Sequence, residues 1–278
     1  KSPGQGSNSN NGFQFVNQIP AIYPVFEHDQ NGKLVNDPKI PGGKSYDYGQ
    51  TADGSRAYAG GINPAGAVRL DRDEDLSNLT TGNLNLEYRF LKDFKLAVTY
   101  GFQSTASKNE TLANPYYGDA AKLGRVSNLN ENDFSWTLNE ILSWGKTFGD
   151  HTVDAFIAHE ATKNEFDFHE SGKKKLILGN VTTLDDGLIR GDISGYRLTY
   201  AIESYFGQAR YDYQNKYYLS TSVRRDGSSR FAPDYRWGTF GSVGAAWIIS
   251  KEKFLSSVKW INNLKLKASY GVLGNQSL

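Results

Sequence analysis

The 278-residue chain contains no cysteine and no methionine, and it lacks any long apolar run. Without cysteine, neither disulfide bonds nor thiolate chemistry is available. The absence of a run of about 18 apolar residues excludes a transmembrane helix but leaves open a transmembrane barrel, whose strands are half polar. An excess of one charge sign is also lacking, because 31 basic and 30 acidic side chains leave a formal net charge of +1. This balance gives no electrostatic reason to expect nucleic acid or an acidic partner.

The chain is instead rich in segments in which apolar and polar residues alternate with period 2. Such alternation places one set of residues on each face of a β-sheet. Four of these segments lie between Ser204 and Tyr270, and one face would carry charged and small polar groups. The other face would carry the apolar set, namely Tyr205, Ala209, Tyr211, Tyr213, Tyr217, Leu219, Val223, Trp237, Val243, Ala245, Trp247, Leu264, Leu266, Ala268 and Tyr270.

The length of the segments and the positions of their aromatic residues indicate a bilayer. Runs of about 9–11 residues match a tilted strand that crosses a membrane, whereas strands of soluble sheets are usually about 5–6 residues long. Tyr211, Tyr213 and Tyr217 lie beside one expected turn, and Trp247 and Trp260 flank the next. An interfacial aromatic girdle has this pattern. The alternative is a soluble β-domain in which these aromatic residues form the core.

The lengths of the connections favour the membrane interpretation. Further strands are expected at 82–91, 94–102, 134–148 and 151–168, and the first of the four segments is expected to extend over 196–213. Short turns are expected at 92–93, 149–150, 214–216 and, somewhat longer, 251–261, and long loops at 104–133, 171–194 and 226–236. Short turns on one side and long loops on the other are typical of outer-membrane barrels. The sequence therefore predicts an all-β fold: an antiparallel transmembrane β-barrel segment of about eight long strands, in an incomplete barrel.

Residues 1–81 are expected to form an extracellular loop region before the barrel segment 82–278. Lys1–Gly12 is low in complexity and reads as a loop or flexible end. Phe13–Tyr48 contains four prolines but many apolar groups, which favours a long ordered loop. Arg69–Asp75 resembles part of a calcium loop, but Leu76 stands where the turn needs glycine. A solvated acidic loop is the preferred interpretation of that run.

The sequence favours a protein that is not an enzyme and holds no cofactor or metal. The four histidines are scattered, and His159 and Glu160, although adjacent, would point to opposite faces of a strand. The chain contains no nucleophile elbow, no HExxH motif and no P-loop. Asp185-Asp186-Gly187 is typical of a turn.

Several motifs together resemble the SusC/RagA family of TonB-dependent outer-membrane transporters. The most specific are the run RRDGSSRF at 224–231, the run RWGTF at 236–240 and the run LKASYGVLGNQ at 266–276. Ser204–Tyr213 also fits, and a weaker likeness extends back to Ile62-Asn63-Pro64 and to Pro20–Phe26. The resemblance therefore touches most of the chain.

The resemblance implies the barrel portion of an importer in the outer membrane of a Gram-negative bacterium. Family members take up glycan or peptide fragments, work with a SusD-like surface lipoprotein and are driven by the TonB complex through a plug inside the barrel. The chain has no recognisable signal peptide, plug or N-terminal domain, so it is expected to be a fragment. The expected partners are thus the SusD-like lipoprotein, the TonB complex through the missing plug, outer-membrane lipid, and an oligosaccharide or peptide. A passive porin and a soluble carbohydrate-binding β-protein are the alternatives.

Three sets of residues are candidates for a functional role. Aromatic side chains in the loops could face the substrate or lid: Tyr23, Phe26, Tyr116 and Tyr117. Charged side chains in the family-specific loop could brace it and the barrel rim: Arg224, Arg225, Asp226, Arg230, Asp234 and Arg236. Charged side chains on the polar face could line the lumen or hold the plug: Glu87, Arg89, Arg210, Asp212, Lys265 and Lys267. For any single loop aromatic residue, packing against other loops is the simpler expectation.

Overall fold

A computed structural model describes residues 23–40, 43–51, 54–55, 63–255, 258 and 260–274. The flexible end expected at Lys1–Gly12 and the first part of the loop expected at Phe13–Tyr48 lie outside these residues. Within the described part of the chain, no helix is long and apolar enough to span a membrane.

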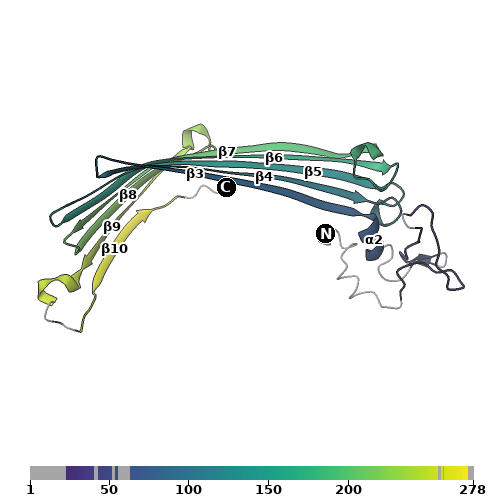
Figure 1. The fold of residues 1–278 in the computed structure, drawn as a ribbon, viewed down its shortest axis with the longest axis horizontal. Coiled ribbons are helices and arrows are strands. Elements are labelled where there is room, and N and C mark those ends of the chain that lie inside the picture. Colours follow the sequence, from purple (N-terminus) through teal and green to yellow (C-terminus); the bar gives the residue numbers. More distant parts are fainter. Residues whose placement is uncertain are drawn as a thin grey trace. The chain divides into compact units, whose positions relative to one another are not determined.

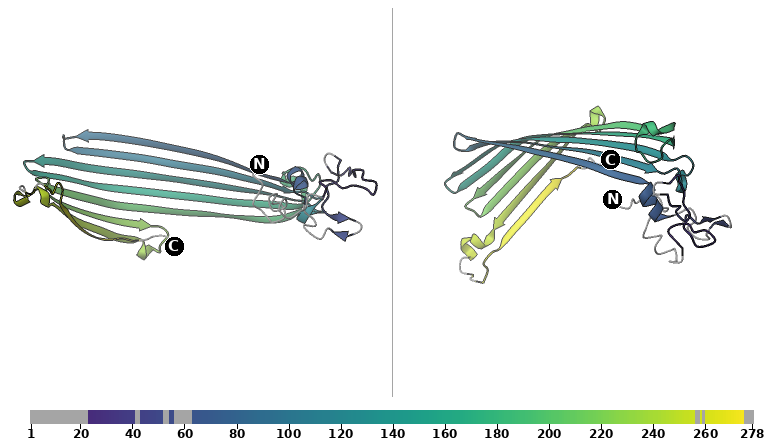
Figure 2. Two further views of the ribbon diagram at one scale, coloured as in Figure 1. Left: turned by 90° about the horizontal axis from the view of Figure 1, so that it is seen from below. Right: turned by 45° about the vertical axis from the view of Figure 1, so that its right-hand side comes forward.

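Eight antiparallel strands form one open sheet in which every strand lies beside its neighbours in sequence (Figures 1 and 2). The strands are β3 (Arg72–Phe90), β4 (Phe94–Ala113), β5 (Arg125–Phe148), β6 (His151–Leu176), β7 (Gly187–Tyr213), β8 (Tyr217–Ser228), β9 (Trp237–Ile248) and β10 (Lys265–Val272). β3 and β10 are the two edges of the sheet, so the sheet does not close on itself. The expected all-β fold and the open sheet are both confirmed.

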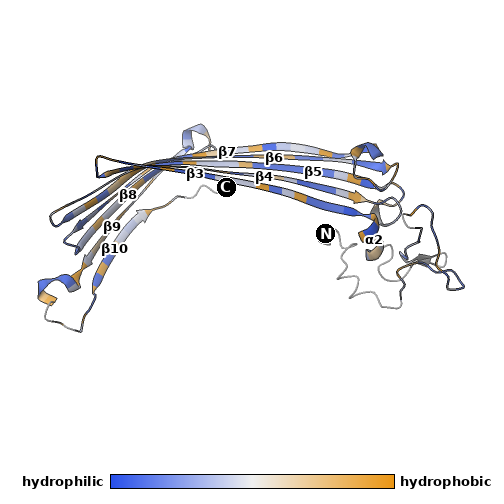
Figure 3. Cartoon of the chain, in the orientation of Figure 1, coloured by the Kyte–Doolittle hydropathy of each residue, from blue (hydrophilic) through white to orange (hydrophobic). Residues whose placement is uncertain are grey.

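The register of the last strands shows why the sequence folds in this way. Tyr217 pairs with Trp247 and Leu219 with Ala245 across β8 and β9, while Leu266 pairs with Trp247 across β9 and β10. Residues that pair across strands share a face, so these apolar residues meet one another on one face of the sheet. Figure 3 shows the resulting alternation of hydrophobic and hydrophilic residues along the strands.

Aromatic rings gather at the end of the sheet where the short turns lie. Phe90 and Phe94 stack across the first short turn with centroids 5.5 Å apart. Farther along the sheet, Tyr213 lies 6.2 Å from Tyr217, which lies 6.2 Å from Trp247. We call Phe90, Phe94, Tyr213, Tyr217 and Trp247 together the lower aromatic row. Above it the apolar face is exposed, as the side chains of Leu86, Leu219 and Leu266 illustrate with half or more of their surface accessible.

The opposite face carries hydrogen bonds between polar side chains. Thr99 Oγ1 donates to Asn85 Oδ1 at 2.8 Å, Asn139 Nδ2 donates to Glu160 Oε2 at 2.9 Å, and the hydroxyls of Ser222 and Ser242 lie 2.7 Å apart. These contacts join strands through side chains as well as through the backbone. One face of the sheet is therefore polar and internally bonded, and the other is apolar.

The turns at the short end have a local chemical basis. Gly149, Gln214 and Asn215 all have positive φ, between 52° and 61°, which suits tight hairpins. The Asp212 carboxylate also accepts the backbone N–H of Asn215. After β9, the 3-10 turns Ile249–Lys251 and Lys253–Leu255 follow.

Glu252 ties this last connection back to the strand ends. Its Oε1 accepts from Tyr217 Oη at 2.6 Å and from Trp247 Nε1 at 3.1 Å, and its Oε2 lies 3.4 Å from Lys216 Nζ. The hydrogen bond from Tyr217, followed by that from Trp247, holds the pKa of the Glu252 carboxyl below its ordinary value. The carboxylate is thus stabilised in its charged form.

Two of the long loops predicted from the sequence are largely strand, and that prediction was wrong. β4 continues to Ala113 and β5 begins at Arg125, where a loop over 104–133 was expected. β6 continues to Leu176 and β7 begins at Gly187, where a loop over 171–194 was expected. These extensions are mostly polar, and their few apolar residues, such as Val126, Leu188 and Ile189, do not follow the alternation that marks a half-buried strand. The connections themselves are 114–124 and 177–186.

β3 likewise begins earlier than the boundary expected at residues 81 and 82. It starts at Arg72, so most of the acidic run Arg69–Asp75 is strand and not loop. The carboxylates of Asp73 and Asp75 both accept from Asn109 Nδ2, at 2.9 and 2.6 Å. No group of three side chains suited to a metal ion occurs among the described residues.

The chain divides into two compact units. One contains the residues up to Asn78 together with Ala106–Asn132 and Asp167–Arg197, and the other contains Leu79–Thr105, Asp133–Phe166 and the residues from Leu198. In the first unit, the hairpin of β1 (Gln50–Thr51) and β2 (Gly54–Ser55) and the helix α2 (Pro64–Leu70) precede the sheet. Asn63 caps α2 by accepting from the N–H of Gly66 at 3.1 Å. A small core of Ile40, Tyr46, Tyr48 and Leu70 stabilises the unit.

The two faces of the sheet predict opposite responses to a new charge. If the apolar face meets lipid, Leu86, Leu96, Val98, Leu219, Val223, Leu266 and Ala268 contact acyl chains. Val98→Arg should then lower the free energy of folding into lipid vesicles by about 2–4 kcal/mol if the residue lies near the bilayer midplane.

Thr99→Arg, on the polar face, is the matched control and should lose only the hydrogen bond to Asn85, about 1 kcal/mol. Equal losses on the two faces would contradict the assignment of the apolar face to lipid.

Candidate functional site

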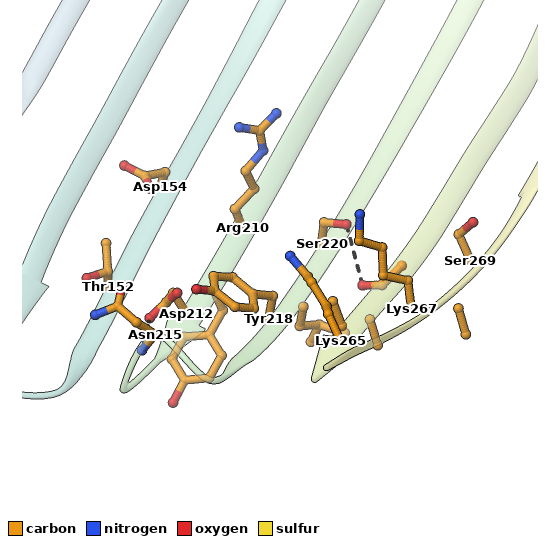
Figure 4. Close-up of a pocket in the computed structure, with 16 residues that line it drawn as sticks. Thr152, Asp154, Arg210, Asp212, Asn215, Tyr218, Ser220, Lys265, Lys267 and Ser269 are labelled. Carbon is orange, nitrogen blue, oxygen red and sulfur yellow. Dashed lines mark hydrogen bonds between the residues drawn. The ribbon is translucent and has the colours of Figure 1, made fainter. Parts of the chain in front are cut away.

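The polar face of the sheet is hollowed near the short-turn end, in a cavity of about 620 Å³ (Figure 4). Its floor consists of small residues of β8, β9 and β10, including Ser220, Gly244 and Ser269. Larger polar side chains from β6 to β10 surround the floor: Thr152, Asp154, Arg210, Asp212, Tyr218, Lys265 and Lys267. We call this cavity the charged hollow. It brings together four of the six charged residues that the sequence offered for the polar face.

The cations of the charged hollow are not neutralised by carboxylates. Arg210, Lys265 and Lys267 form no ion pair within the part of the chain that the structure describes, although Asp154 and Asp212 line the same cavity. Three cations against two carboxylates leave a surplus of one positive charge. Lys265 Nζ lies 4.9 Å from the centroid of the Tyr218 ring. The hollow thus offers charged groups and hydrogen-bond donors that can engage a polar partner.

The other two residues of this set, Glu87 and Arg89, lie on β3 and pair with each other. Arg89 Nε donates to Glu87 Oε1 at 2.8 Å, and Lys95 Nζ lies 3.5 Å from Glu87 Oε2. The hydrogen bond from Arg89 to an exposed carboxylate has a modest energy. A second cavity of about 620 Å³ on this side contains Arg89 together with Asp154 and Arg210, which also line the charged hollow.

The family-specific run is organised around Arg224. Its Nε donates to Asp226 Oδ1 at 2.6 Å, and its Nη2 donates to Glu160 Oε1 at 3.0 Å and to the fully buried Ser204 Oγ at 2.9 Å. The guanidinium also lies 4.7 Å from the Phe206 centroid. One side chain therefore connects β6, β7 and β8 on the polar face.

The other members of the expected brace do not gather around Asp226 and Asp234, so that part of the prediction was wrong. Arg225 lies 5.3 Å from the Trp237 centroid, and Arg230 lies 4.1 Å from that of Tyr200. Arg236 Nε donates to the Phe231 carbonyl at 3.2 Å, and Asp234 lies in the 3-10 turn Pro233–Tyr235. Strand alternation explains the separation, because Arg224 and Arg225 must point to opposite faces.

Sequence reasoning missed Glu160 and Ser204 as partners of Arg224. The signal that was available is the register: Ser204 pairs with Asp226 and Phe206 with Arg224, so their side chains share the polar face. Glu160 reaches the same face from β6, whereas the adjacent His159 contacts Glu140 on the other face. The expectation that His159 and Glu160 point to opposite faces is thus confirmed.

Three of the four loop aromatic residues pack into the core of the first unit. Phe26, Tyr116 and Tyr117 lie against that core, and the Tyr117 ring stacks on Tyr48 with centroids 3.9 Å apart and an interplanar angle of 7°. Tyr117 Oη lies 3.1 Å from Ser45 Oγ. Burial raises the pKa of the Tyr48 hydroxyl and that of the Tyr117 hydroxyl above the ordinary value for tyrosine. Tyr23 remains 38% exposed.

An open antiparallel meander with one apolar and one polar face is the geometry of the wall of a membrane β-barrel. The family described as TonB dependent receptor-like, beta-barrel matches residues 23–273. The chain belongs to this family, whose members are outer-membrane proteins.

Individual relatives agree with the family assignment. The chain is 30% identical over 220 residues to the TonB-dependent receptor SusC of Bacteroides thetaiotaomicron, covering 78% of this chain and 21% of SusC. It is 45% identical over 80 residues to the TonB-dependent receptor P39 of Formosa agariphila, covering 29% of this chain and 8% of that receptor. The chain thus spans about a fifth or less of the length of these relatives. The resemblance to the SusC/RagA family seen in the motifs is confirmed.

Solved structures show the same fold. The RagAB peptide importer in its 'closed-closed' state superposes with a TM-score of 0.74 at 23% identity, covering 99% of this chain and 29% of that chain. The RagAB peptide transporter gives a TM-score of 0.72 at 22% identity over 83% of this chain and 26% of that chain.

The contacts of Arg224 predict a measurable contribution to stability. Arg224→Gln should lower the free energy of unfolding by about 1–2 kcal/mol, because Glu160 and Asp226 lose a shared cation while remaining only partly hydrated. The value lies below that of a fully buried group because the Arg224 side chain is 39% exposed. Denaturant unfolding in lipid vesicles measures the change.

Arg89→Gln is the control, since its pair with Glu87 is 77% and 45% exposed, and it should change stability much less than Arg224→Gln does. Similar losses in the two variants would contradict a special role of Arg224.

The stacking of Tyr117 predicts a local effect in the first unit. Tyr117→Ala should accelerate amide hydrogen exchange at 43–48, because the ring of Tyr48 loses its stacking partner and Ser45 loses a hydroxyl contact. Tyr117→Phe keeps the ring and should exchange nearly as slowly as the unmodified chain. Tyr235→Ala removes a ring that is 80% exposed and should leave exchange at 43–48 unchanged. Unaltered exchange in Tyr117→Ala would refute the packing role.

Proposed function

We propose that the chain is part of the barrel wall of a TonB-dependent nutrient importer in the outer membrane of a Gram-negative bacterium. The observation that carries the proposal is the family match over residues 23–273, which fits the two-faced open sheet. In this role the apolar face contacts lipid and the polar face lines the barrel interior. The short turns lie on the periplasmic side, and the longer connections, with the extended ends of β3–β7, lie outside the cell.

The charged hollow is proposed to face a plug inside the barrel. Its cations have no carboxylate partners within the described residues, and its floor consists of small side chains that allow close approach. A second polar element placed there could donate and accept hydrogen bonds and neutralise Arg210, Lys265 and Lys267. Glu87 and Arg89 are proposed to line the same interior. Movement of the plug, driven by the TonB complex, would then open a path along this face.

The relatives support a proposal for the substrate class and the external partner. RagAB is a peptide importer by its description, and SusC is a TonB-dependent receptor. We propose that the complete protein imports oligosaccharide or peptide fragments together with a SusD-like lipoprotein. Tyr23, which is 38% exposed, is the loop aromatic residue proposed for a substrate or lid contact. Catalysis is not part of the proposal, because the relatives that support it are described as a receptor and a transporter.

The charged hollow provides a test in the full-length transporter. Replacing Arg210, Lys265 and Lys267 together with glutamine should reduce energised uptake strongly, by about tenfold or more, because interior contacts with the plug are lost. Assembly in the outer membrane should be normal. Uptake of labelled peptides and oligosaccharides by cells measures the effect.

A variant with Lys163→Gln and Glu165→Gln is the control, because these two side chains pair with each other and line neither the charged hollow nor the second cavity. Uptake that persists without proton-motive force would favour a passive porin. Extraction of the protein without detergent would favour a soluble β-protein.

A further inference from the structure

The first part of β7 is an edge of the sheet. β7 has 27 residues and β8 has 12, and their pairing ends where Ile202 meets Ser228. β7 lies between β6 and β8, so within the described residues its segment Gly187–Gly195 has a strand neighbour only on the β6 side. Figures 1 and 2 show β7 continuing past the end of β8. We call Gly187–Gly195 the open edge.

The pairing of β7 with β8 ends at contacts of Ser229. Its backbone N–H donates to the Ala201 carbonyl at 2.9 Å, and its Oγ accepts the Ala201 N–H at 2.8 Å. The N–H of Ser228 donates to the Arg236 carbonyl at 3.0 Å, and Pro233, in the turn between them, has no N–H with which to continue a ladder. The chain therefore turns back here, and β8 does not extend along the open edge.

The contacts of Ala201 also show which backbone groups of β7 point away from β6. Both its N–H and its C=O are directed to the β8 side, and alternate residues of an antiparallel strand share this direction. The same alternation places the N–H and C=O groups of Ile189, Gly191, Ile193 and Gly195 on the open side. These groups recur at every second residue, which is the spacing that the backbone of an added strand matches.

Exposed apolar side chains accompany the open edge on both faces. Leu188 lies on one face and Ile189 and Ile193 on the other, and 62%, 48% and 59% of their surface is accessible. By contrast, Leu112 and Val126, on the extensions of the interior strands β4 and β5, are almost completely buried. The apolar residues of the interior strands are thus already covered, whereas the side chains of an added strand would cover those of the open edge.

The open edge lacks the residues that usually block an unpaired strand. Proline and lysine are the common protective residues, and the open edge contains neither of them. Its two charged residues, Arg190 and Asp192, have opposite signs. Arg197, just beyond the open edge, donates to Asp167 on β6. An incoming strand of low net charge would therefore meet no proline ring and no excess of one charge sign.

On the basis of the proposed importer function, we infer that the open edge binds a peptide substrate as an added β-strand. The peptide backbone would exchange hydrogen bonds with Ile189, Gly191, Ile193 and Gly195, and its apolar side chains would pack beside those of the edge. In the proposed orientation this part of β7 lies outside the cell, where substrate arrives.

The chemistry of the open edge distinguishes the two substrate classes of the proposed function. An oligosaccharide carries hydroxyl groups in place of a regular series of amide N–H and carbonyl groups, so it cannot continue a β-ladder. An extended peptide continues the ladder whatever its sequence, and apolar residues at alternate positions add contacts on one face. The open edge therefore selects peptide over oligosaccharide.

Binding of methylated peptides to the full-length transporter tests the inference. The probe is a fluorescent peptide of about eight residues in which valine and threonine alternate, with a lysine at each end for solubility. N-methylation of every second residue leaves one edge of the peptide intact and should change its affinity less than about threefold. N-methylation of the same number of successive residues blocks both edges and should lower the affinity about tenfold or more. Fluorescence anisotropy measures both affinities.

A pair of variants tests the edge from the protein side. Ile193→Pro removes an N–H on the open side, where a sheet edge tolerates proline, and should lower peptide affinity about tenfold. Ile193→Ala is the matched control: it keeps the N–H and loses only side-chain contacts, so it should weaken binding much less. Assembly in the outer membrane is measured in parallel. The methylated peptides probe the unmodified protein, so they decide the matter even where a variant fails to assemble.

Equal affinities of the two methylated peptides, or peptide binding that Ile193→Pro leaves unchanged, would overturn the inference. Slow hydrogen exchange at Gly191 and Ile193 before peptide is added would also overturn it, because another segment or a partner protein would then occupy the edge. Binding of maltoheptaose in competition with the peptide would contradict the selection of peptide, while import itself would stand. Absence of energised uptake of both substrate classes would instead contradict the proposed function, so the two failures are distinguishable.

Discussion

Antiparallel pairing fixes the face to which every side chain of this sheet points. Once Tyr217 pairs with Trp247, the hydrogen-bond ladder assigns all later residues of β8 and β9 alternately to the apolar and the polar face. A slip of one residue would exchange the two faces completely. Such a slip would place Arg224 among the apolar side chains and Leu219 on the polar side. The large energetic difference between these environments keeps the register unique, and the charged hollow and the contacts of Arg224 both depend on it.

The sequence allowed the strands and their faces to be predicted where one face is apolar. Alternation predicted the cores of all eight strands, and the motifs at 224–240 and 266–276 pointed to the family that the comparisons show. The extensions of β4 to Ala113 and of β5 back to Arg125 were missed. Strands that are polar on both faces leave no periodic signal, because their stability comes from ladder hydrogen bonds and contacts such as that between Thr111 and Ser127.

The candidate residues show the same division between what periodicity encodes and what tertiary contacts decide. Alternation assigned Arg210, Asp212, Lys265 and Lys267 to one face, and the structure brings them into one cavity. It could not show that Arg224 reaches Glu160 on β6, because that contact depends on two strand pairings. Nor could it show that Tyr117 stacks on Tyr48, since their positions are far apart in the chain. The pairing of cations with carboxylates therefore differs along the polar face. Arg224 binds the carboxylates of Asp226 and Glu160, whereas Arg210, Lys265 and Lys267 form no ion pair within the described residues.

A carboxylate on the apolar face of a membrane barrel is tolerated only at certain depths. The cost of a charge is greatest at the bilayer midplane and falls to about 0–1 kcal/mol near the interfaces. Glu140 therefore looks anomalous in the sequence, as an acid within an apolar row. Its hydrogen bond with His159, whose ring stacks on Tyr205, explains its presence, because the carboxylate has a polar partner at this level of the sheet. The same depth dependence explains why the residues between the level of Glu140 and Tyr205 and the lower aromatic row, such as Leu142 and Leu219, are apolar.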